Sequence, residues 1–357
     1  MDKFTDPLID CSGLKQGYVI FEPGRGGEHK KPRYHERSIV NIDALSAFVA
    51  LYGVIKSVFK TKKIELEFVE LMKSINMAFD DINVNSSLLR KKIYADIFSV
   101  HLYERIYRKK GVEAVFATVR PLDVFCAGNN LGLKTYELQH GVSYEGTELY
   151  SGFRDERLLP SYFLAFGENE PKDVYGISED RIINIGFAFH TFLNNLIPKT
   201  ELNISNAVLV VSDPEITNTL VPLVAGLAKD NKDMTMYYRC HPHEFLTSEQ
   251  KQVLLDSGVK IQDNTINISI VLNQFNNIIG ENSTVLYEAI SCGKKVGKLF
   301  FEGLNPEYLS PTDNEYFWEI KSQEDFENFI KAPVPQKKNK SIYSDFNVGL
   351  FKNLLKR

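Results

Sequence analysis

Apolar and polar residues along most of this chain follow two alternating patterns. Short apolar runs of the kind found in buried strands are each followed by a longer segment in which apolar residues recur every three or four positions, as on a helix. The run at 207–211 and the helical pattern over 217–229 form the clearest pair. Strands that alternate with helices form parallel sheets covered on both faces. The pattern therefore predicts an α/β protein.

The first half of the chain is expected to contain a βαβ unit that closes on Gln139-His140-Gly141. In chain order its elements are a strand at 18–21, a helix over 42–58, a long helix capped by Ser86 or Ser87, a strand at 113–117, a helix over 120–131, and strands at 134–138, 163–166 and 181–185.

The second half repeats the alternation. In chain order its elements are a strand at 207–211, a helix over 217–229, a strand at 234–238, a helix over 248–256, strands at 259–261 and 277–279, a helix over 284–292 and a strand at 295–300.

Turn-forming residues interrupt the pattern between 190 and 204. We therefore expect two Rossmann-like domains with parallel sheets that face a central cleft, the first over 1–194 and the second over 195–335. Residues 336–357 are expected to form a linker and a C-terminal helix that packs back on the body.

Composition places the chain among ordinary globular proteins. Its 357 residues are 43% hydrophobic and 25% charged, with a net charge of −4, so no whole-chain argument for nucleic-acid binding exists. No apolar run reaches the ~18 residues of a membrane span, and the N-terminus does not resemble a signal peptide. We expect a cytoplasmic protein. The short basic clusters are either solvated surface or contacts with an anionic membrane or acidic acceptor, so any membrane association is peripheral.

The four cysteines have no metal-pair spacing, which fits a reducing compartment. Zinc binding by Cys240, His241 and His243 is disfavoured because the three are crowded and lack a distant partner. No Gly-x-Ser-x-Gly elbow is present, which argues against an α/β-hydrolase. We expect neither a metal nor a cofactor.

Polar residues follow two apolar strands of the second half. Arg239 and His241 come at the end of one strand, and Pro242 fixes the chain direction after them. An imidazole at this position can donate to a phosphate oxygen, and the alternative is a surface turn. At carboxyl ends of parallel strands such groups hold nucleotides.

Ser283 and Thr284 lie where the other strand meets a helix. Hydroxyls and backbone N–H groups at a helix N-terminus bind anions, although Ser283 could also be a plain helix cap. Glu288 lies four residues after Thr284 on the same face, where a carboxylate can accept from ribose hydroxyls. Its alternative is an exposed helix glutamate.

The first half offers candidates for an acceptor site. His140, between Gln139 and Gly141, is expected to project into the cleft and take a proton from an acceptor hydroxyl, unless it is a structural histidine. Glu145, in an irregular segment, is a second candidate base. Arg25, in a glycine-rich loop, is free to meet an anionic acceptor.

These residues resemble motifs of GT-B glycosyltransferases. His241-Pro242 with Ser283-Thr284 resembles the His-Pro and Ser/Thr motifs of bacterial sialyltransferases and Kdo transferases, which use CMP-sugars. The resemblance implies that His241, Ser283 and Thr284 hold the donor phosphate. It spans residues 110–300 and depends on the order and spacing of short motifs.

A second resemblance concerns proteins of capsule, O-antigen and teichoic-acid assembly. Gln139-His140-Gly141 is similar to their motifs, as are Leu159-Pro160, Gly167-Glu168 and Ile185-Gly186. In the CDP-glycerol glycerophosphotransferases a His-Gly pair supplies the base, which implies that role for His140. The sialyltransferases instead place an acidic pair before a glycine, whereas this chain has Tyr144-Glu145-Gly146. Glu288 also fits UDP-sugar enzymes, so the donor nucleotide stays open.

The sequence thus predicts a metal-independent glycosyltransferase. A nucleotide-sugar, CMP-linked or UDP-linked, would donate to a glycan or lipid-linked glycan acceptor, with peripheral contact at the inner membrane. Three alternatives are a CDP-glycerol-type polyol-phosphate transferase, a nucleotide-sugar epimerase, and a non-catalytic nucleotide-binding protein.

Overall fold

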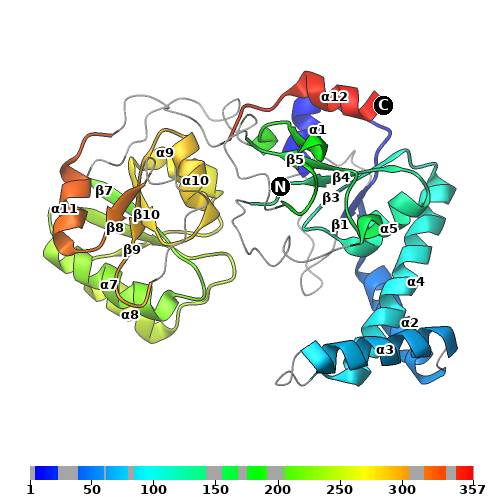
Figure 1. The fold of residues 1–357 in the computed structure, drawn as a ribbon. Helices are drawn as coiled ribbons and strands as arrows, with labels where there is room; N and C mark the ends of the chain where they lie inside the picture. Colours follow the sequence, from blue (N-terminus) through cyan, green and yellow to red (C-terminus); the bar gives the residue numbers. More distant parts are fainter. Residues whose placement is uncertain are drawn as a thin grey trace.

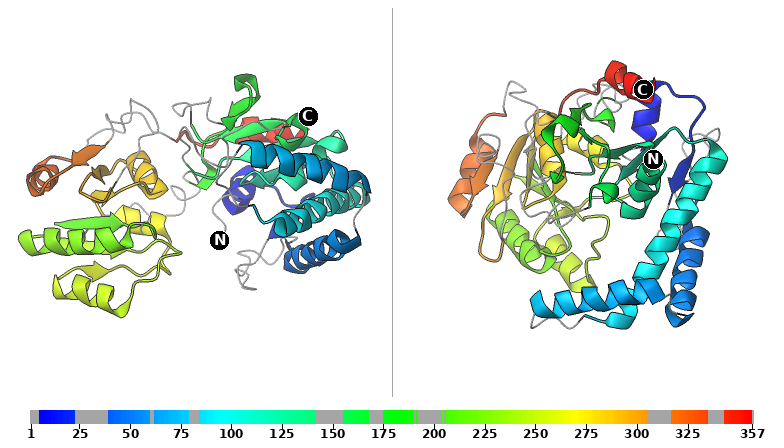
Figure 2. Two further views of the ribbon diagram at one scale, coloured as in Figure 1. Left: turned by 60° about the horizontal axis from the view of Figure 1, so that its bottom comes forward. Right: turned by 45° about the vertical axis from the view of Figure 1, so that its right-hand side comes forward.

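A computed structural model describes the chain in two lobes that lie side by side (Figures 1 and 2). The described residues are 5–22, 39–59, 62–78, 84–141, 155–167, 175–189, 191, 204, 206–304, 317–334 and 343–356. Each lobe contains a parallel sheet with helices on its faces, which confirms the predicted α/β class.

The second lobe, here called the C-lobe, is built on a six-stranded parallel sheet ordered β12-β11-β10-β7-β8-β9. Its strands are β7 (Ala207–Val211), β8 (Thr235–Arg239), β9 (Lys260–Ile261), β10 (Asn277–Gly280), β11 (Lys295–Leu299) and β12 (Trp318–Ile320). The chain builds outward from β7 in one direction and restarts at β10 in the other. The strand order therefore reverses between β7 and β10, as in a Rossmann sheet.

Helices cover both faces of this sheet. Strand β7 is therefore apolar throughout and buried at every position. Val208 and Val210 pack on the side of α7 (Thr217–Asp230), α8 (Ser248–Asp256) and α11 (Gln323–Lys331). Leu209 and Val211 pack on the side of α9 (Ile268–Gln274) and α10 (Thr284–Ser291). The C-lobe is thus a three-layer sandwich whose sheet has no solvated face.

The first lobe, here called the N-lobe, holds a four-stranded parallel sheet ordered β3-β4-β5-β6. Its strands are β3 (Ala114–Thr118), β4 (Lys134–Leu138), β5 (Tyr162–Ala165) and β6 (Ile182–Asn184). Helices α4 (Ser86–Lys110) and α5 (Leu122–Asn130) cover one face. Helices α1 (Thr5–Ser12) and α12 (Val348–Lys356) cover the other. Two 3-10 turns, η1 (Glu156–Leu158) and η3 (Glu179–Arg181), precede β5 and β6.

Helix α12 lies on the N-lobe although it follows the C-lobe in sequence (Figure 1). The Phe351 ring packs edge-on against Phe116 at 5.7 Å, and the Tyr136 hydroxyl donates to the Leu354 carbonyl at 3.4 Å. Before the helix, Ser344 exchanges backbone hydrogen bonds with Phe166 and Phe187. The C-terminal segment therefore supplies a layer of the other lobe.

Two local features of the N-lobe bear on the predictions. The predicted strand at 18–21 is present as β1 (Ile20–Glu22), which pairs with β2 (Ile39–Asn41) in a separate two-stranded sheet. The cap of α4 is Asn85 instead of Ser86 or Ser87: its side chain accepts from the Leu88 N–H, so the helix starts one residue earlier.

The N-lobe also carries a helical arm, defined here as α2 (Asp43–Phe59), α3 (Lys62–Ala78) and α4 (Figures 1 and 2). Helices α2 and α4 pack closely: the rings of Tyr52 and Phe98 stack at 3.8 Å. Gly53 allows this approach, because a Cβ there would lie 2.8 Å from the Ala95 Cβ. Helix α3, which the sequence did not predict, is fixed to α4 by the Glu65–Arg90 ion pair at 2.9 Å.

Within the described residues no single helix has the length and apolar composition of a membrane span. Helices α2 and α3 taken together, bent by 92° at their junction, pass that test by length and composition only.

Candidate active site

The carboxyl ends of the C-lobe strands form the edge where a ligand is expected, because the strand order reverses between β7 and β10. Ser212 follows β7 at this edge, and the segment from Glu281 to Thr284 follows β10. Gly280 ends β10 so close to β7 that a Cβ there would lie 2.7 Å from the Val211 carbonyl oxygen. His241 follows β8, next to β7 on the other side.

A buried carboxylate holds the His241 turn in place. Glu244 Oε1 accepts from the hydroxyls of Ser212, Thr217 and Tyr238 at 2.8–2.9 Å. Its Oε2 accepts from the His241 N–H at 2.9 Å, and its own N–H donates to the His241 carbonyl at 2.9 Å. Burial raises the pKa of the Tyr238 hydroxyl well above its usual range, so this donor stays protonated. Four donors on one carboxylate make the turn rigid.

The turn also sets the state of the His241 ring. The backbone N–H of His243 donates to His241 Nδ1 at 3.2 Å. A neutral imidazole that accepts at Nδ1 carries its proton on Nε2. His241 is half-buried while Pro242 and His243 are exposed. The ring is therefore held as an Nε2–H donor.

Arg239 ends β8, where it was predicted, and its guanidinium reaches the loop after β9. Its guanidinium is buried and donates to the carbonyls of Asp263 and Ile266, the latter at 2.6 Å. Burial lowers the pKa of this guanidinium below its ordinary value. The structure gives Arg239 the task of ordering the loop after β9, which also borders the carboxyl edge.

Ser283 and Thr284 open α10. Ser283 is the N-cap, and its hydroxyl accepts from the Val285 N–H at 3.3 Å, as the capping alternative predicted. Thr284 is the first helical residue and is half-buried. Glu288 is 5% exposed, so it is not the exposed helix glutamate that was the alternative reading of the sequence.

On the N-lobe, Gln139, His140 and Gly141 follow β4. Gln139 is fully buried: its side-chain oxygen accepts from the Phe166 N–H at 2.6 Å and its amide donates to the Gly141 carbonyl at 2.8 Å. These bonds clamp the turn, so Gln139 lies inside it instead of facing outward. His140, at the apex, is exposed.

The two lobes meet at this turn and also where Phe166 and Phe187 pack with the C-lobe core. A methyl group added at Gly141 would lie 3.2 Å from Thr284 Cγ2, tighter than nine in ten real contacts of that kind. The structure thus brings the residue next to His140 against the first residue of α10. The predicted acceptor and donor sides are in contact at this point.

Two features near these turns were not predicted from the sequence. Glu244 stands in the stretch Arg239–Glu244, and an acid three residues after a histidine is the only sequence signal for its role. The other is a buried ion pair: Arg120 Nε, after β3, donates to Glu137 Oε2 on β4 at 2.7 Å. Val119 and Arg120 both have positive φ, 60° and 41°, which marks strained backbone at the carboxyl edge.

Two predicted residues, Arg25 and Glu145, lie outside the described residues. Among those the structure describes, no three His, Cys, Asp or Glu side chains group as a metal site. Burial, assisted by the charge of Glu244, raises the pKa of Cys240 to about 11, so this thiol is protonated at neutral pH.

No known protein-family profile matches the sequence, and no curated protein matches it. Similar solved structures include a Listeria monocytogenes protein named as a UDP-N-acetylglucosamine 2-epimerase (12% identity, 74% of this chain and 79% of that one, TM-score 0.55). A second UDP-N-acetylglucosamine 2-epimerase has 13% identity over 74% and 79%, with a TM-score of 0.52. The spinosyn forosaminyltransferase SpnP has 11% identity over 72% and 79%, with a TM-score of 0.45. The chain has the GT-B type of α/β fold, with two Rossmann-like lobes, that nucleotide-sugar epimerases and glycosyltransferases share.

Proposed function

We propose that this protein is a glycosyltransferase that moves a sugar from a nucleotide-sugar to a hydroxyl group of a glycan or lipid-linked glycan. The acceptor belongs to surface-polysaccharide or lipopolysaccharide assembly at the cytoplasmic face of the membrane, as the motif resemblance implies. The reaction needs no metal in this proposal, because protein groups stabilise the departing nucleotide.

The C-lobe edge binds the donor. His241 donates from Nε2 to a phosphate oxygen, a role that its accepted bond at Nδ1 supports. Ser283, Thr284 and the N-terminal end of α10 add hydroxyl and N–H donors and a favourable helix dipole. These groups would stabilise the charge that grows on the leaving phosphate. Glu288 accepts from ribose hydroxyls, and Arg239 acts indirectly by ordering the loop after β9.

The N-lobe turn binds the acceptor. His140 takes the proton of the attacking hydroxyl, since a histidine can exchange protons near neutral pH. Glu145 stays the second candidate for this task. Gln139 fixes the turn through the backbone of Phe166 and Gly141.

The observation that carries this proposal is the approach of Gly141 to Thr284. A transferase must bring an acceptor base and a donor phosphate site within the length of one sugar. A turn with an exposed histidine that touches the first residue of a helix at the sheet switch point meets this requirement. A protein that only bound nucleotide would not need the N-lobe turn there.

A thermal-shift panel with CMP, CDP, UDP, GDP and their sugars tests the donor assignment. A true donor or its nucleotide should raise the melting temperature by mass action, and His241→Ala should abolish most of that rise. His243→Ala is the matched control, since it removes the neighbouring exposed imidazole and keeps the backbone N–H. No response to any nucleotide, or equal responses in both variants, would contradict the donor site.

A nucleotide-sugar epimerase is the second candidate, because the two epimerase structures share this fold. An epimerase converts the nucleotide-sugar that raises the melting temperature even when no acceptor is present. A transferase leaves it intact, apart from slow hydrolysis, until an acceptor is added. Product analysis of donor-only reactions decides between them, and consumption of CDP-glycerol would indicate polyol-phosphate transfer instead.

A further inference from the structure

Helix α2 carries an apolar stripe that no described part of the chain covers. Leu51, Ile55, Val58 and Phe59 recur at intervals of three or four residues, so they share one face of the helix. They are between 47% and 75% exposed. Other residues of α2, such as Tyr52 and Gly53, make the contacts with α4. The stripe is therefore additional to what the fold of the arm needs.

The neighbouring helices enlarge this surface. On α3 Leu66 and Val69 are exposed, and on α4 Leu88 is exposed. Exposed apolar residues of this number on the three helices of the arm exceed the scattered residues of an ordinary surface. We call the α2 stripe together with these residues the apolar arm surface.

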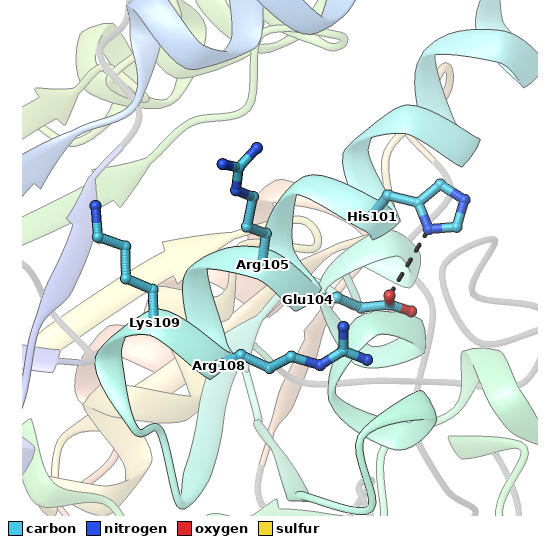
Figure 3. Close-up of a pocket in the computed structure, with 5 residues that line it drawn as sticks. All are labelled: His101, Glu104, Arg105, Arg108 and Lys109. Atoms are coloured by element: carbon cyan, nitrogen blue, oxygen red, sulfur yellow. Dashed lines mark ion pairs between the residues drawn. The ribbon is translucent and has the colours of Figure 1, made fainter.

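Basic residues lie beside it on α4. A pocket of about 650 Å³ is lined by His101, Glu104, Arg105, Arg108 and Lys109 (Figure 3). In Figure 3, Arg105 and Lys109 extend to one side of the helix, and Arg108 lies on the side of Glu104 and His101. The single carboxylate, Glu104, already accepts from Asn130 at 2.8 Å and pairs with His101 at 3.7 Å. The pocket thus has a surplus of positive charge.

The cations lie on the same helical arm as the apolar arm surface. Arg105 and Lys109 lie seven and eleven residues after Phe98, which places all three on one face of α4. Phe98 is the residue that α2 covers, through Tyr52 at 3.8 Å and Phe48 at 5.6 Å. The helical arm therefore presents exposed apolar side chains along α2 together with arginine and lysine towards the C-terminal end of α4.

We propose that the helical arm docks on an anionic lipid bilayer, with the apolar arm surface in the interface and a lipid phosphate in the α4 pocket. Apolar side chains combined with arginine and lysine are the composition that binds anionic membranes. A second copy of the chain fits less well, because a symmetric contact would bring two positively charged pockets together. This docking does not depend on the reaction that the protein catalyses.

The test is co-sedimentation of the full-length protein with vesicles of phosphatidylcholine alone or of an equal mixture with phosphatidylglycerol. The protein should prefer the anionic vesicles by about tenfold or more, and added salt should weaken this binding. Ile55→Glu with Val58→Glu removes the apolar contribution, and Arg105→Glu with Lys109→Glu removes the charge. Each pair should lower anionic-vesicle binding by about tenfold or more.

Matched controls lie in the C-lobe. Leu255→Glu changes a leucine that is 54% exposed on α8, and Lys229→Glu with Lys251→Glu reverses two exposed lysines. Both controls should bind vesicles as the unmodified protein does. Circular dichroism confirms folding, and Ile55→Ser with Val58→Ser replaces the glutamate pair if that pair unfolds.

Equal binding to both vesicle types, or unchanged binding by both arm variants, would overturn the proposal. Light scattering tests whether a second copy of the chain covers the surface. A dimer of the unmodified protein that Ile55→Glu with Val58→Glu converts to monomer would show that a second copy covers the surface and that the proposal is wrong.

Discussion

At the scale of single residues, His241 lies in a turn that hydrogen bonds hold in place. Its Nδ1 accepts from a backbone N–H, and the Glu244 carboxylate fixes the turn that carries it. His241→Ala should lower transfer by about 100-fold if Nε2–H stabilises the developing phosphate charge. His241→Gln keeps a donor near that position and should lose less. Steady-state donor consumption measures both, and equal losses would exclude a donating role.

A second residue-scale prediction concerns Lys295, a fully buried lysine on β11 that donates to the carbonyls of Ile330 and Ala332. Burial lowers its pKa from 10.5 to about 8. Between these pH values the unfolded chain holds more protons than the folded one, so stability rises with pH. The free energy of unfolding relative to Lys295→Met should therefore increase by about 1–3 kcal/mol across this interval. Denaturant titrations at several pH values measure the difference, and a constant difference would contradict it.

At the scale of elements, β3 and β4 are linked by the buried pair of Arg120 and Glu137. Removing one partner leaves a buried charge, so Glu137→Leu should cost about 3–5 kcal/mol. Adding Arg120→Met should recover most of that loss. Hydrogen exchange of β3 and β4 is the right measurement, because the single tryptophan, Trp318, lies on β12 in the other lobe. If the double variant recovers no stability, an unpaired Arg120 is not the cause of the loss in Glu137→Leu.

Elements were predictable wherever one periodicity dominated. The strand at 207–211 is apolar at every position and the helix over 248–256 has a capping box at Thr247, and both match the structure. Helix α3 gave no such signal, since residues 64–68 alternate apolar and acidic residues with the period of a strand. Strand β12 has only three residues, too few for a pattern.

The candidate site was predictable only in part for a related reason. Polar residues at strand ends can be read from the chain, which is how His241 and Ser283 were found. The partners of Glu244 cannot, because Ser212 is 32 residues away and meets it only after the sheet forms. Arg239 illustrates the same limit. Its position at a strand end suggested a ligand contact, but its guanidinium donates to carbonyl oxygens of the nearby loop.

At the scale of the whole molecule, Gly141 of the N-lobe lies against Thr284 of the C-lobe. Gly141→Ala should disturb this contact and lower transfer by about tenfold while nucleotide binding persists. Thr284→Ser removes the opposing methyl group and keeps the hydroxyl, so it should restore transfer to the alanine variant. Donor consumption and nucleotide thermal shifts, measured in both backgrounds, test this. If Gly141→Ala lowers transfer equally with Thr284 and with Thr284→Ser, the contact between the lobes is not the cause of the loss.

The position of α12 determines which fragments of this protein can be produced separately. A contiguous piece of the first half lacks the helix that buries Phe116 and Tyr136, so its sheet would present bare aromatic rings to water. The segment 206–334 contains every strand and covering helix described for its own sheet, but Phe166, Phe187 and Tyr343 from outside it pack into the core on the side of α9 and α10. An isolated C-lobe would expose part of that core, so nucleotide-binding studies should use the whole chain. Work on the acceptor half requires either the whole polypeptide or a rearranged chain in which α12 is joined ahead of α1, its neighbour on the same face.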